Sequence, residues 1–219
     1  MPANVNWAGN VYHGLPKNLL GFSPEPKGGY LAFLGRISPE KRPDRTIDIA
    51  AKAGLPLKIA AKVDKHDQAY WDEKIEPMTK ANPNVEFVGE ICENQKAHFL
   101  DALALLVPID WPEPFGLVMI ESVACGTPVI AFRSGSVPEV IDDGVSGFVV
   151  NSVEEAAKAI SRLSEIDRAA VRAAFENRFT VERMARDYLK IYASLPGVRR
   201  EIDQSRRIIG KEIGFQLPL

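Results

Sequence analysis

Two cationic side chains, Arg36 and Lys41, stand five residues apart in a loop that follows an apolar run and precedes a helical pattern. A helix N-terminus carries a partial positive charge, and a strand-to-helix loop lets both side chains converge on one anion. Arginine offers a planar fork of donors and lysine a compact charge, so this pair suits a diphosphate. The alternative interpretation is an ordinary solvated loop, and the position alone does not decide between the two.

A second segment, from Asp110 to Glu121, contains two further carboxylates. Pro112 and Pro114 restrict the backbone around Glu113, which can hold this carboxylate at a strand end where it accepts hydrogen bonds from hydroxyl groups. Glu121 follows eight residues later, so the two carboxylates cannot be neighbours on one helix face. They can reach different parts of one elongated ligand. Alternatively, Glu121 is a surface residue of its helix.

Backbone donors add to this second segment. The N–H groups near Phe115, Gly116 and Leu117 fall at a helix start, where they have no partner inside the helix. A glycine turn at Gly135 opens another short helix and could also hold a phosphate or a hydroxyl group. That signal is weak alone, because Glu139 in the same turn could equally cap its own helix.

The elements that must position these residues alternate along the chain. Short apolar runs predict six strands, at residues 30–34, 57–61, 85–88, 104–107, 128–132 and 147–150. Helical patterns lie between them, at residues 42–53, 67–80, 94–103, 116–124 and 137–141, and helices continue after residue 150 as far as Ser194. This alternation predicts an α/β, Rossmann-like, doubly wound parallel sheet with helices on both faces and C-terminal helices added. Such sheets bind ligands at the carboxyl ends of their strands.

Composition excludes several classes of protein. The chain has 219 residues, with 27 Lys and Arg against 29 Asp and Glu, and this net charge of −2 gives no basic footprint for nucleic acid. Its two cysteines fit a reducing compartment, and no signal peptide or membrane-spanning run is evident, so we expect a cytoplasmic protein, with the inner membrane surface as a variant of that location. His13, His66 and His98 lack ligand spacing, so no metal site is expected.

Three parts are predicted along the chain. Residues 1–27 have little periodicity and are interpreted as a linker or as the remnant of a missing N-terminal domain. Residues 28–195 form the Rossmann-like domain, and residues 196–219 form a peripheral helix or a tail. A glycine-rich dinucleotide fingerprint does not follow the first strand, where Arg36 and Lys41 stand instead, and this argues against a dinucleotide oxidoreductase.

Several of these motifs, in this order, resemble the donor-binding half of the family 4 retaining glycosyltransferases. They are Gly35-Arg36 with Lys41, Glu113-Pro-Phe-Gly with Glu121, Ala124-Cys-Gly-Thr-Pro-Val-Ile130 and Gly135-Ser-Val-Pro-Glu139. The resemblance covers roughly residues 11–191, and the paired glutamates with their phenylalanine and glycine are its most specific part. It implies the GT-B fold, in which two Rossmann-like domains face each other across a cleft.

The resemblance also implies residue roles. Arg36 and Lys41, after Gly35, match the cations that bind the donor diphosphate, and Glu113 matches the glutamate that faces the donor sugar. Glu121 matches the carboxylate that takes the ribose hydroxyls. The other matching positions are Phe115, Gly116 and Leu117, whose backbone N–H groups meet sugar and phosphate, and Val88, Gly89 and Ile91, which line the base pocket.

The chemistry implied is hexosyl transfer with retention from a nucleoside-diphosphate sugar, without a cofactor or a catalytic metal. A UDP-hexose is the favoured donor, while the base, sugar and acceptor stay open. The family's first domain, which supplies most of the acceptor site, has no counterpart in these 219 residues. The alternative is therefore a non-catalytic nucleotide-sugar-binding or assembly module of a split enzyme. We expect self-association, or a partner chain or domain, through surfaces near residues 5–20 and 188–192.

Overall fold

A computed structural model describes residues 7–195, and in these residues six parallel strands form one sheet with the order β3-β2-β1-β4-β5-β6. The strands are β1 (Leu31–Arg36), β2 (Leu57–Lys62), β3 (Val85–Gly89), β4 (Ala104–Val107), β5 (Val129–Phe132) and β6 (Gly147–Val150). Every neighbouring pair of strands is parallel, so each connection crosses over a face of the sheet. The predicted Rossmann-like, doubly wound sheet of six strands is confirmed.

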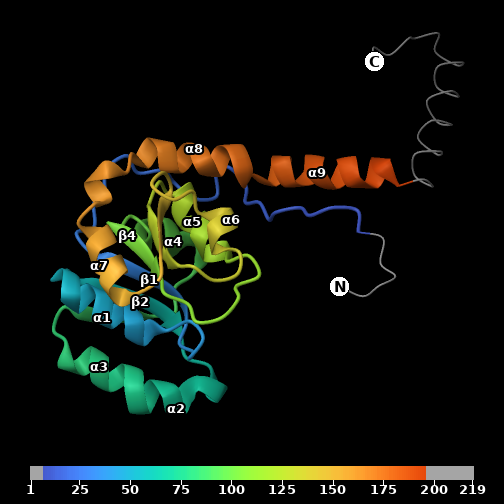
Figure 1. Ribbon diagram of the computed structural model, residues 1–219. Coiled ribbons are helices and arrows are strands. Elements are labelled where there is room, and N and C mark those ends of the chain that lie inside the picture. The colour runs from blue at the N-terminus through green and yellow to red at the C-terminus, as the bar shows by residue number, and fades with distance from the viewer. Residues whose placement is uncertain (1–6, 196–219) are drawn as a thin grey trace, which may run out of the picture.

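Helices cover both faces of the sheet (Figure 1). They are α1 (Pro43–Ala53), α2 (Gln68–Tyr70), α3 (Glu76–Ala81), α4 (Glu93–Phe99), α5 (Leu117–Ala124), α6 (Val137–Val140), α7 (Val153–Ile160), α8 (Arg168–Arg178) and α9 (Val181–Ser194). Helix α1 packs with α7 and α3 on one face, and α5 packs with α8 on the other. Because both faces are covered, the central strands β4 and β5 are buried at every residue, which explains their unbroken apolar sequences.

Helix α1 shows how the sequence sets the boundaries of a helix next to the site. Pro43 occupies its first turn, where a missing N–H costs nothing, and Asp44 complements the positive end of the helix. Gly54 ends the helix in the left-handed conformation (φ 68°), and its N–H bonds the carbonyls of Ala50 and Ala51. The carboxyl end of β1 is therefore followed at once by a well-defined helix N-terminus.

The predicted helix over residues 67–80 is interrupted in the structure. A 3₁₀ turn (Lys65–Asp67) leads into α2, a π-helical stretch (Trp71–Ile75) follows, and α3 completes the segment. Pro77 lacks an N–H, and its ring would collide with the carbonyl four residues earlier in a regular α-helix. The wider π-helical turn avoids this collision. The predicted helix over 94–103 ends earlier, at Phe99, because the residues after it lead into β4.

The N-terminal segment packs on the domain instead of standing away from it. Leu20 is buried in the core, and Arg172 of α8 donates hydrogen bonds to the carbonyls of Leu20 (3.3 Å) and Lys17 (2.8 Å). Arg168 donates a hydrogen bond to the carbonyl of Ser23 at 2.9 Å. The predicted domain boundary at residue 28 therefore does not coincide with a break in packing. The assignment of residues 1–27 as a linker or as a remnant of another domain stays a prediction.

Helix α9 projects from the body of the domain, and the N-terminal segment runs along it (Figure 1). No residue of α9 is buried, Leu189 is 65% exposed, and the rings of Tyr188 and Tyr192 stack with their centroids 6.0 Å apart. This surface is the one for which we expect self-association or a partner, and that expectation stays a prediction. The predicted tail, residues 196–219, and the first six residues lie outside the described part of the chain.

Candidate functional site

The predicted site residues gather around two hollows at the carboxyl ends of the strands. The larger hollow has a volume of about 590 Å³ and lies between β1, β4 and the start of α5. The smaller hollow has a volume of about 300 Å³ and extends toward β2 and α4. Both are lined by Leu34, Gly35, Arg36 and Val118, so they form one continuous trough. Its position agrees with the expectation for a doubly wound sheet.

Of the two predicted cations, Arg36 lies where the hollows meet and Lys41 lies in the larger hollow. Arg36, at the end of β1, lines both hollows and pairs with Glu40 (3.2 Å) and Asp64 (3.6 Å). Its side chain is 52% exposed, so these pairs are weak and open to exchange with a ligand. Lys41 reaches the larger hollow from the loop before α1, and its Nζ lies 4.9 Å from the centroid of the Trp111 ring.

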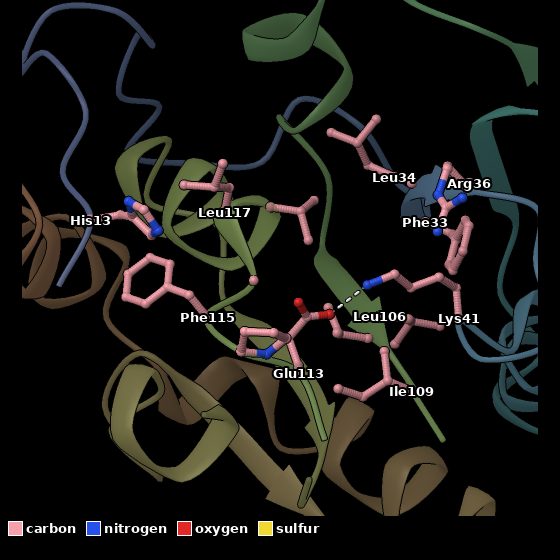
Figure 2. Close-up of a pocket in the computed structure, with 15 residues that line it drawn as sticks. His13, Phe33, Leu34, Arg36, Lys41, Leu106, Ile109, Glu113, Phe115 and Leu117 are labelled. Carbon is pink, nitrogen blue, oxygen red and sulfur yellow. Dashed lines mark hydrogen bonds and ion pairs between the residues drawn. The ribbon is translucent and has the colours of Figure 1, made fainter. Parts of the chain in front are cut away.

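Glu113 stands in the larger hollow opposite these cations and pairs with Lys41 (Figure 2). The indole N–H of Trp111 donates to the same carboxylate oxygen at 3.1 Å. Only 11% of the Glu113 side chain is exposed, so its two partners compensate for much of its lost hydration. Trp111, two residues before Glu113 in the sequence, therefore orients the carboxylate.

The turn at Gly135 holds the backbone of the Glu113 loop. The N–H of Ser136 donates to the carbonyl of Glu113, and the hydroxyl of Ser136 donates to the carbonyl of Phe115, both at 2.9 Å. Gly135 has φ 55°, and a Cβ there would lie 2.3 Å from the carbonyl oxygen of Glu113. Glycine is thus required for both conformation and space. This turn supports the site, whereas Glu139 accepts a hydrogen bond from the Tyr12 hydroxyl (2.8 Å) and does not cap its own helix.

Asp110 joins the loop with the cations to the loop with Glu113. Its N–H donates to the carbonyl of Glu40 at 2.9 Å, and its carboxylate pairs with Arg42 (2.8 Å) and Arg45 (3.2 Å). Arg42 is the one residue other than glycine with a positive φ (53°) in the part of the chain that the structure describes. This strained conformation is compensated by its ion pairs with Asp110 and Asp44. Lys41, immediately before it, is therefore held toward Glu113.

The start of α5 brings backbone donors to the larger hollow. Phe115, Gly116 and Leu117 all line it, and Gly116 begins the helix in the left-handed conformation (φ 79°). The first N–H groups of a helix lack intrahelical partners and carry a partial positive charge. They lie beside Glu113 and across from Lys41, so this part of the hollow can bind an anionic or hydroxylated group.

Glu121 lies in the smaller hollow, inside α5, and its side chain is also only 11% exposed. It pairs with Lys96 of α4 at 2.7 Å, and Lys96 also pairs with Glu93 at 2.9 Å. Burial tends to lower the pKa of Lys96, but the hydrogen bonds with Glu121 and Glu93 outweigh it and raise that pKa. The two carboxylates of the predicted motif thus lie in different hollows of the trough, as their spacing suggests.

Most predicted site residues meet in the trough. Ile91 lines the smaller hollow, but Val88 and Gly89 line neither hollow, and Val88 is 40% exposed. A contact of these two residues with a base stays a prediction. The prediction missed several residues that line the hollows, and some of them carry side chains that can bind a polar ligand. Two of these are Lys96, whose sequence position is an ordinary exposed helix position, and His13, which lies in a segment without periodicity.

Two further features concern the described residues alone. No three His, Cys, Asp or Glu side chains among residues 7–195 cluster closely enough to hold a metal ion. In that same range, every helix is too short or too polar to cross a membrane.

Comparison with known proteins agrees with this geometry. Residues 22–178 match the sequence profile of the family described as "Glycosyl transferases group 1". The chain is 34% identical over 152 residues to the D-inositol 3-phosphate glycosyltransferase of Mycobacterium marinum and 33% identical over 146 residues to that of Mycolicibacterium smegmatis. These matches cover 67% and 64% of this chain, but only 32% and 34% of the two relatives. The chain thus spans about a third of their length.

Solved structures share the fold. HepE from Anabaena, crystallised in complex with UDP, superposes with a TM-score of 0.76 at 22% identity, covering 84% of this chain and 57% of HepE. Sucrose-phosphate synthase from Thermosynechococcus elongatus superposes with a TM-score of 0.72 at 23% identity, covering 83% of this chain and 51% of that enzyme. Because the family profile covers well over half of the chain, the chain belongs to the group 1 glycosyltransferases.

Proposed function

We propose that this chain binds a nucleoside-diphosphate sugar and forms the donor half of a retaining glycosyltransferase that transfers a hexosyl group. One observation carries the proposal. A continuous trough has Glu121 at one end, Glu113 at the other, and the cations Arg36 and Lys41 between them. A nucleotide sugar has the same order of groups, with ribose hydroxyls at one end, sugar hydroxyls at the other and a diphosphate in the middle.

The proposed roles follow from this order of groups. Arg36, Lys41 and the start of α5 bind the diphosphate and offset the charge that develops on it as the leaving group. The bond between the anomeric carbon and the diphosphate oxygen breaks, and the acceptor oxygen bonds to that carbon on the same face. The acceptor's hydroxyl proton passes to the departing phosphate oxygen. Glu113 lies where it can stabilise positive charge on the anomeric carbon.

A UDP-hexose is the donor that we favour. HepE was crystallised with UDP and with UDP-glucose, and it shares the fold of this chain over 84% of the chain's length. UDP-glucose and UDP are therefore the first ligands to test. Guanosine and adenosine diphosphates and their glucose conjugates complete the panel, so that the titration itself identifies the base.

The experiment is a calorimetric titration of the full chain with this panel. We expect at least one nucleoside diphosphate to bind the wild-type chain. Arg36→Ala and Lys41→Ala should each weaken its binding by about 1.5–3 kcal/mol, the range for a lost charge-assisted hydrogen bond. The affinity for the corresponding nucleoside, which lacks phosphates, should be the same for the variants and the wild type. The proposed function is wrong if no ligand in the panel binds the wild-type chain. It is also wrong if the two substitutions weaken binding of the nucleoside as much as binding of the nucleoside diphosphate.

Metal dependence provides a second test. Side-chain cations and the start of α5 can neutralise the diphosphate, so we expect donor affinity to change less than about two-fold in EDTA. Binding that appears only with added Mn²⁺ or Mg²⁺ would contradict the proposed way of binding the phosphates.

The acceptor half must come from elsewhere, since the chain spans only about a third of its curated relatives. The remaining part of such an enzyme would supply the acceptor site, on the same polypeptide or on a partner chain. Incubating the chain with a donor that it binds distinguishes an active enzyme from a binding module. Slow hydrolysis of the donor indicates catalysis by this half alone, and binding without hydrolysis indicates the module.

A further inference from the structure

A histidine from the N-terminal segment lines the larger hollow. The imidazole of His13 meets the Phe115 ring edge to face, with centroids 4.9 Å apart and an interplanar angle of 75°. Figure 2 shows His13 and Phe115 across the hollow from Arg36 and Lys41, with Glu113 between the two sides. His13 thus lies at the end of the site where Glu113 lies.

The backbone on the C-terminal side of His13 is fixed. Leu15 forms a parallel bridge beside Thr180, in which its N–H donates to Phe179 and its carbonyl accepts from Val181, both at 2.9 Å. Gly14 lies against the same turn so closely that a Cβ would stand 2.4 Å from the carbonyl oxygen of Thr180. The segment is therefore held to the start of α9 at a spacing that only glycine allows.

The backbone on the other side of His13 is also held. The guanidinium of Arg183 donates to the carbonyls of both Tyr12 and His13, each at 2.9 Å, and it is itself paired with Asp187 at 3.1 Å. The hydroxyl of Tyr12 donates to Glu139 at 2.8 Å. These bonds hold the backbone at His13, from which the imidazole reaches the Phe115 ring.

The imidazole itself makes no hydrogen bond within residues 7–195, and His13 is exposed. A neutral imidazole offers one donor and one acceptor, which matches a sugar hydroxyl. Along the trough, Glu121 lines only the smaller hollow and His13 lines only the larger one. A ligand with its ribose at Glu121 would therefore present its far end, the sugar, to His13.

We propose that His13 hydrogen-bonds a hydroxyl group of the donor's transferred sugar and so contributes to recognising the sugar. This inference rests on the proposed function, because it uses the same trough and the same direction of the donor. It adds a residue from outside the predicted Rossmann-like domain to the site. A role restricted to packing against Phe115 is the alternative that the experiment must separate.

Three substitutions of His13 separate a hydrogen bond from packing. His13→Ala removes both, His13→Phe keeps an aromatic ring against Phe115 but no polar atom, and His13→Gln keeps a polar group without the ring. We expect His13→Ala and His13→Phe to lower the affinity for UDP-glucose by roughly 3- to 10-fold, the effect of one lost hydrogen bond. His13→Gln should recover most of that affinity. UDP, which lacks the sugar, should stay within about two-fold of wild type for all three.

The matched control is His66→Ala, an exposed histidine on the 3₁₀ turn before α2 that lines neither hollow. Thermal unfolding of each variant verifies that the fold is retained. If His13→Phe binds UDP-glucose as the wild type does, or if UDP weakens as much as UDP-glucose, the inference is overturned while the proposed function stands. If the wild-type chain binds no member of the nucleotide panel, the proposed function fails and the role of His13 fails with it.

Discussion

Lys41 and Glu113, which lie 72 residues apart in the sequence, form an ion pair across the candidate site. The Lys41 cation proposed for the diphosphate is therefore already neutralised by the carboxylate proposed for the sugar. A diphosphate that approaches Lys41 must share or displace this pairing, and Glu113 keeps its second partner, Trp111, at 3.1 Å. Ligand binding would thereby free the carboxylate for the sugar, so the two ends of the donor are coupled through one ion pair.

The first prediction concerns Glu113→Gln. The amide keeps the shape but removes the charge that competes for Lys41, so binding of UDP should be unchanged or tighter. Binding of UDP-glucose should weaken by roughly 1–3 kcal/mol, because a hydroxyl group of the sugar is left mispaired at a mostly buried side chain. Calorimetry with both ligands measures the two effects separately.

The control for Glu113→Gln is Glu86→Gln. Glu86 also pairs with a lysine, Lys58, at 3.1 Å, but it is exposed and lies outside both hollows. This control should leave both ligands unchanged. If Glu113→Gln weakens UDP as much as UDP-glucose, the carboxylate contacts the nucleotide and the proposed direction of the donor is wrong.

The second prediction places the ribose. Glu121→Gln should weaken UDP and UDP-glucose by equal amounts, about 1–3 kcal/mol, since both ligands carry the ribose that this carboxylate is proposed to bind. Glu93→Gln is the matched control, because Glu93 also pairs with Lys96 but does not line the trough. Calorimetry that shows a larger loss for UDP-glucose than for UDP would contradict this placement.

The third prediction concerns acid stability and the buried Asp44. Burial tends to raise the pKa of Asp44, but hydrogen bonds from Arg42 (2.9 Å) and Lys74 (2.8 Å) outweigh it and hold the pKa well below its usual range. A depressed folded-state pKa stabilises the fold above the unfolded value, near 4, and this stabilisation is lost as the pH falls toward the folded value. We expect Asp44→Asn to lower the free energy of unfolding at pH 7 by roughly 2–3 kcal/mol.

Urea unfolding at pH 7, 5 and 3.5 measures this contribution. The difference between wild type and Asp44→Asn should shrink at the lowest pH, because Asp44 then loses part of its advantage over the unfolded state. Asp48→Asn on the same helix is the control, since burial raises the pKa of Asp48 and its charge therefore does not stabilise the fold. A difference for Asp44→Asn that stays constant with pH would show that its charge is not responsible.

The sheet and the location of the site could be predicted because both follow from local patterns. Unbroken apolar runs predict buried parallel strands, and the carboxyl ends of parallel strands meet at one edge. Arg36, Lys41 and Glu113 were therefore expected at that edge, and the trough contains all three. The interruption of the predicted helix over 67–80 was missed because a single proline, Pro77, changes the turn without interrupting the apolar pattern.

Other parts of the site depend on contacts that no local pattern reveals. Lys96 meets Glu121 only because α4 and α5 pack on the same side of the trough, and the sequence around Lys96 is that of an exposed helix. His13 enters the site only because the N-terminal segment pairs with Thr180, more than 160 residues later. The supporting role of Gly135 likewise depends on its contact with Glu113, so the sequence suggests only a turn there.

The last prediction tests that support. In Gly135→Ala the new Cβ would lie 2.3 Å from the carbonyl oxygen and 2.4 Å from the nitrogen of Glu113, and the residue would keep a positive φ of 55°. Gly144→Ala is the matched control, because Gly144 has φ 78° but no atom within 4 Å of the added Cβ. The control should lose on the order of 1–2 kcal/mol of unfolding free energy, which is the conformational cost alone. The loss in Gly135→Ala should be larger by at least about 1 kcal/mol. Because the collision displaces the Glu113 backbone, Gly135→Ala should also lower the affinity for UDP-glucose by at least about ten-fold. Gly144→Ala should bind UDP-glucose as the wild type does. Both variants are measured at a temperature where they are folded. Equal losses of stability, together with unchanged affinity, would mean that the turn at Gly135 does not position Glu113.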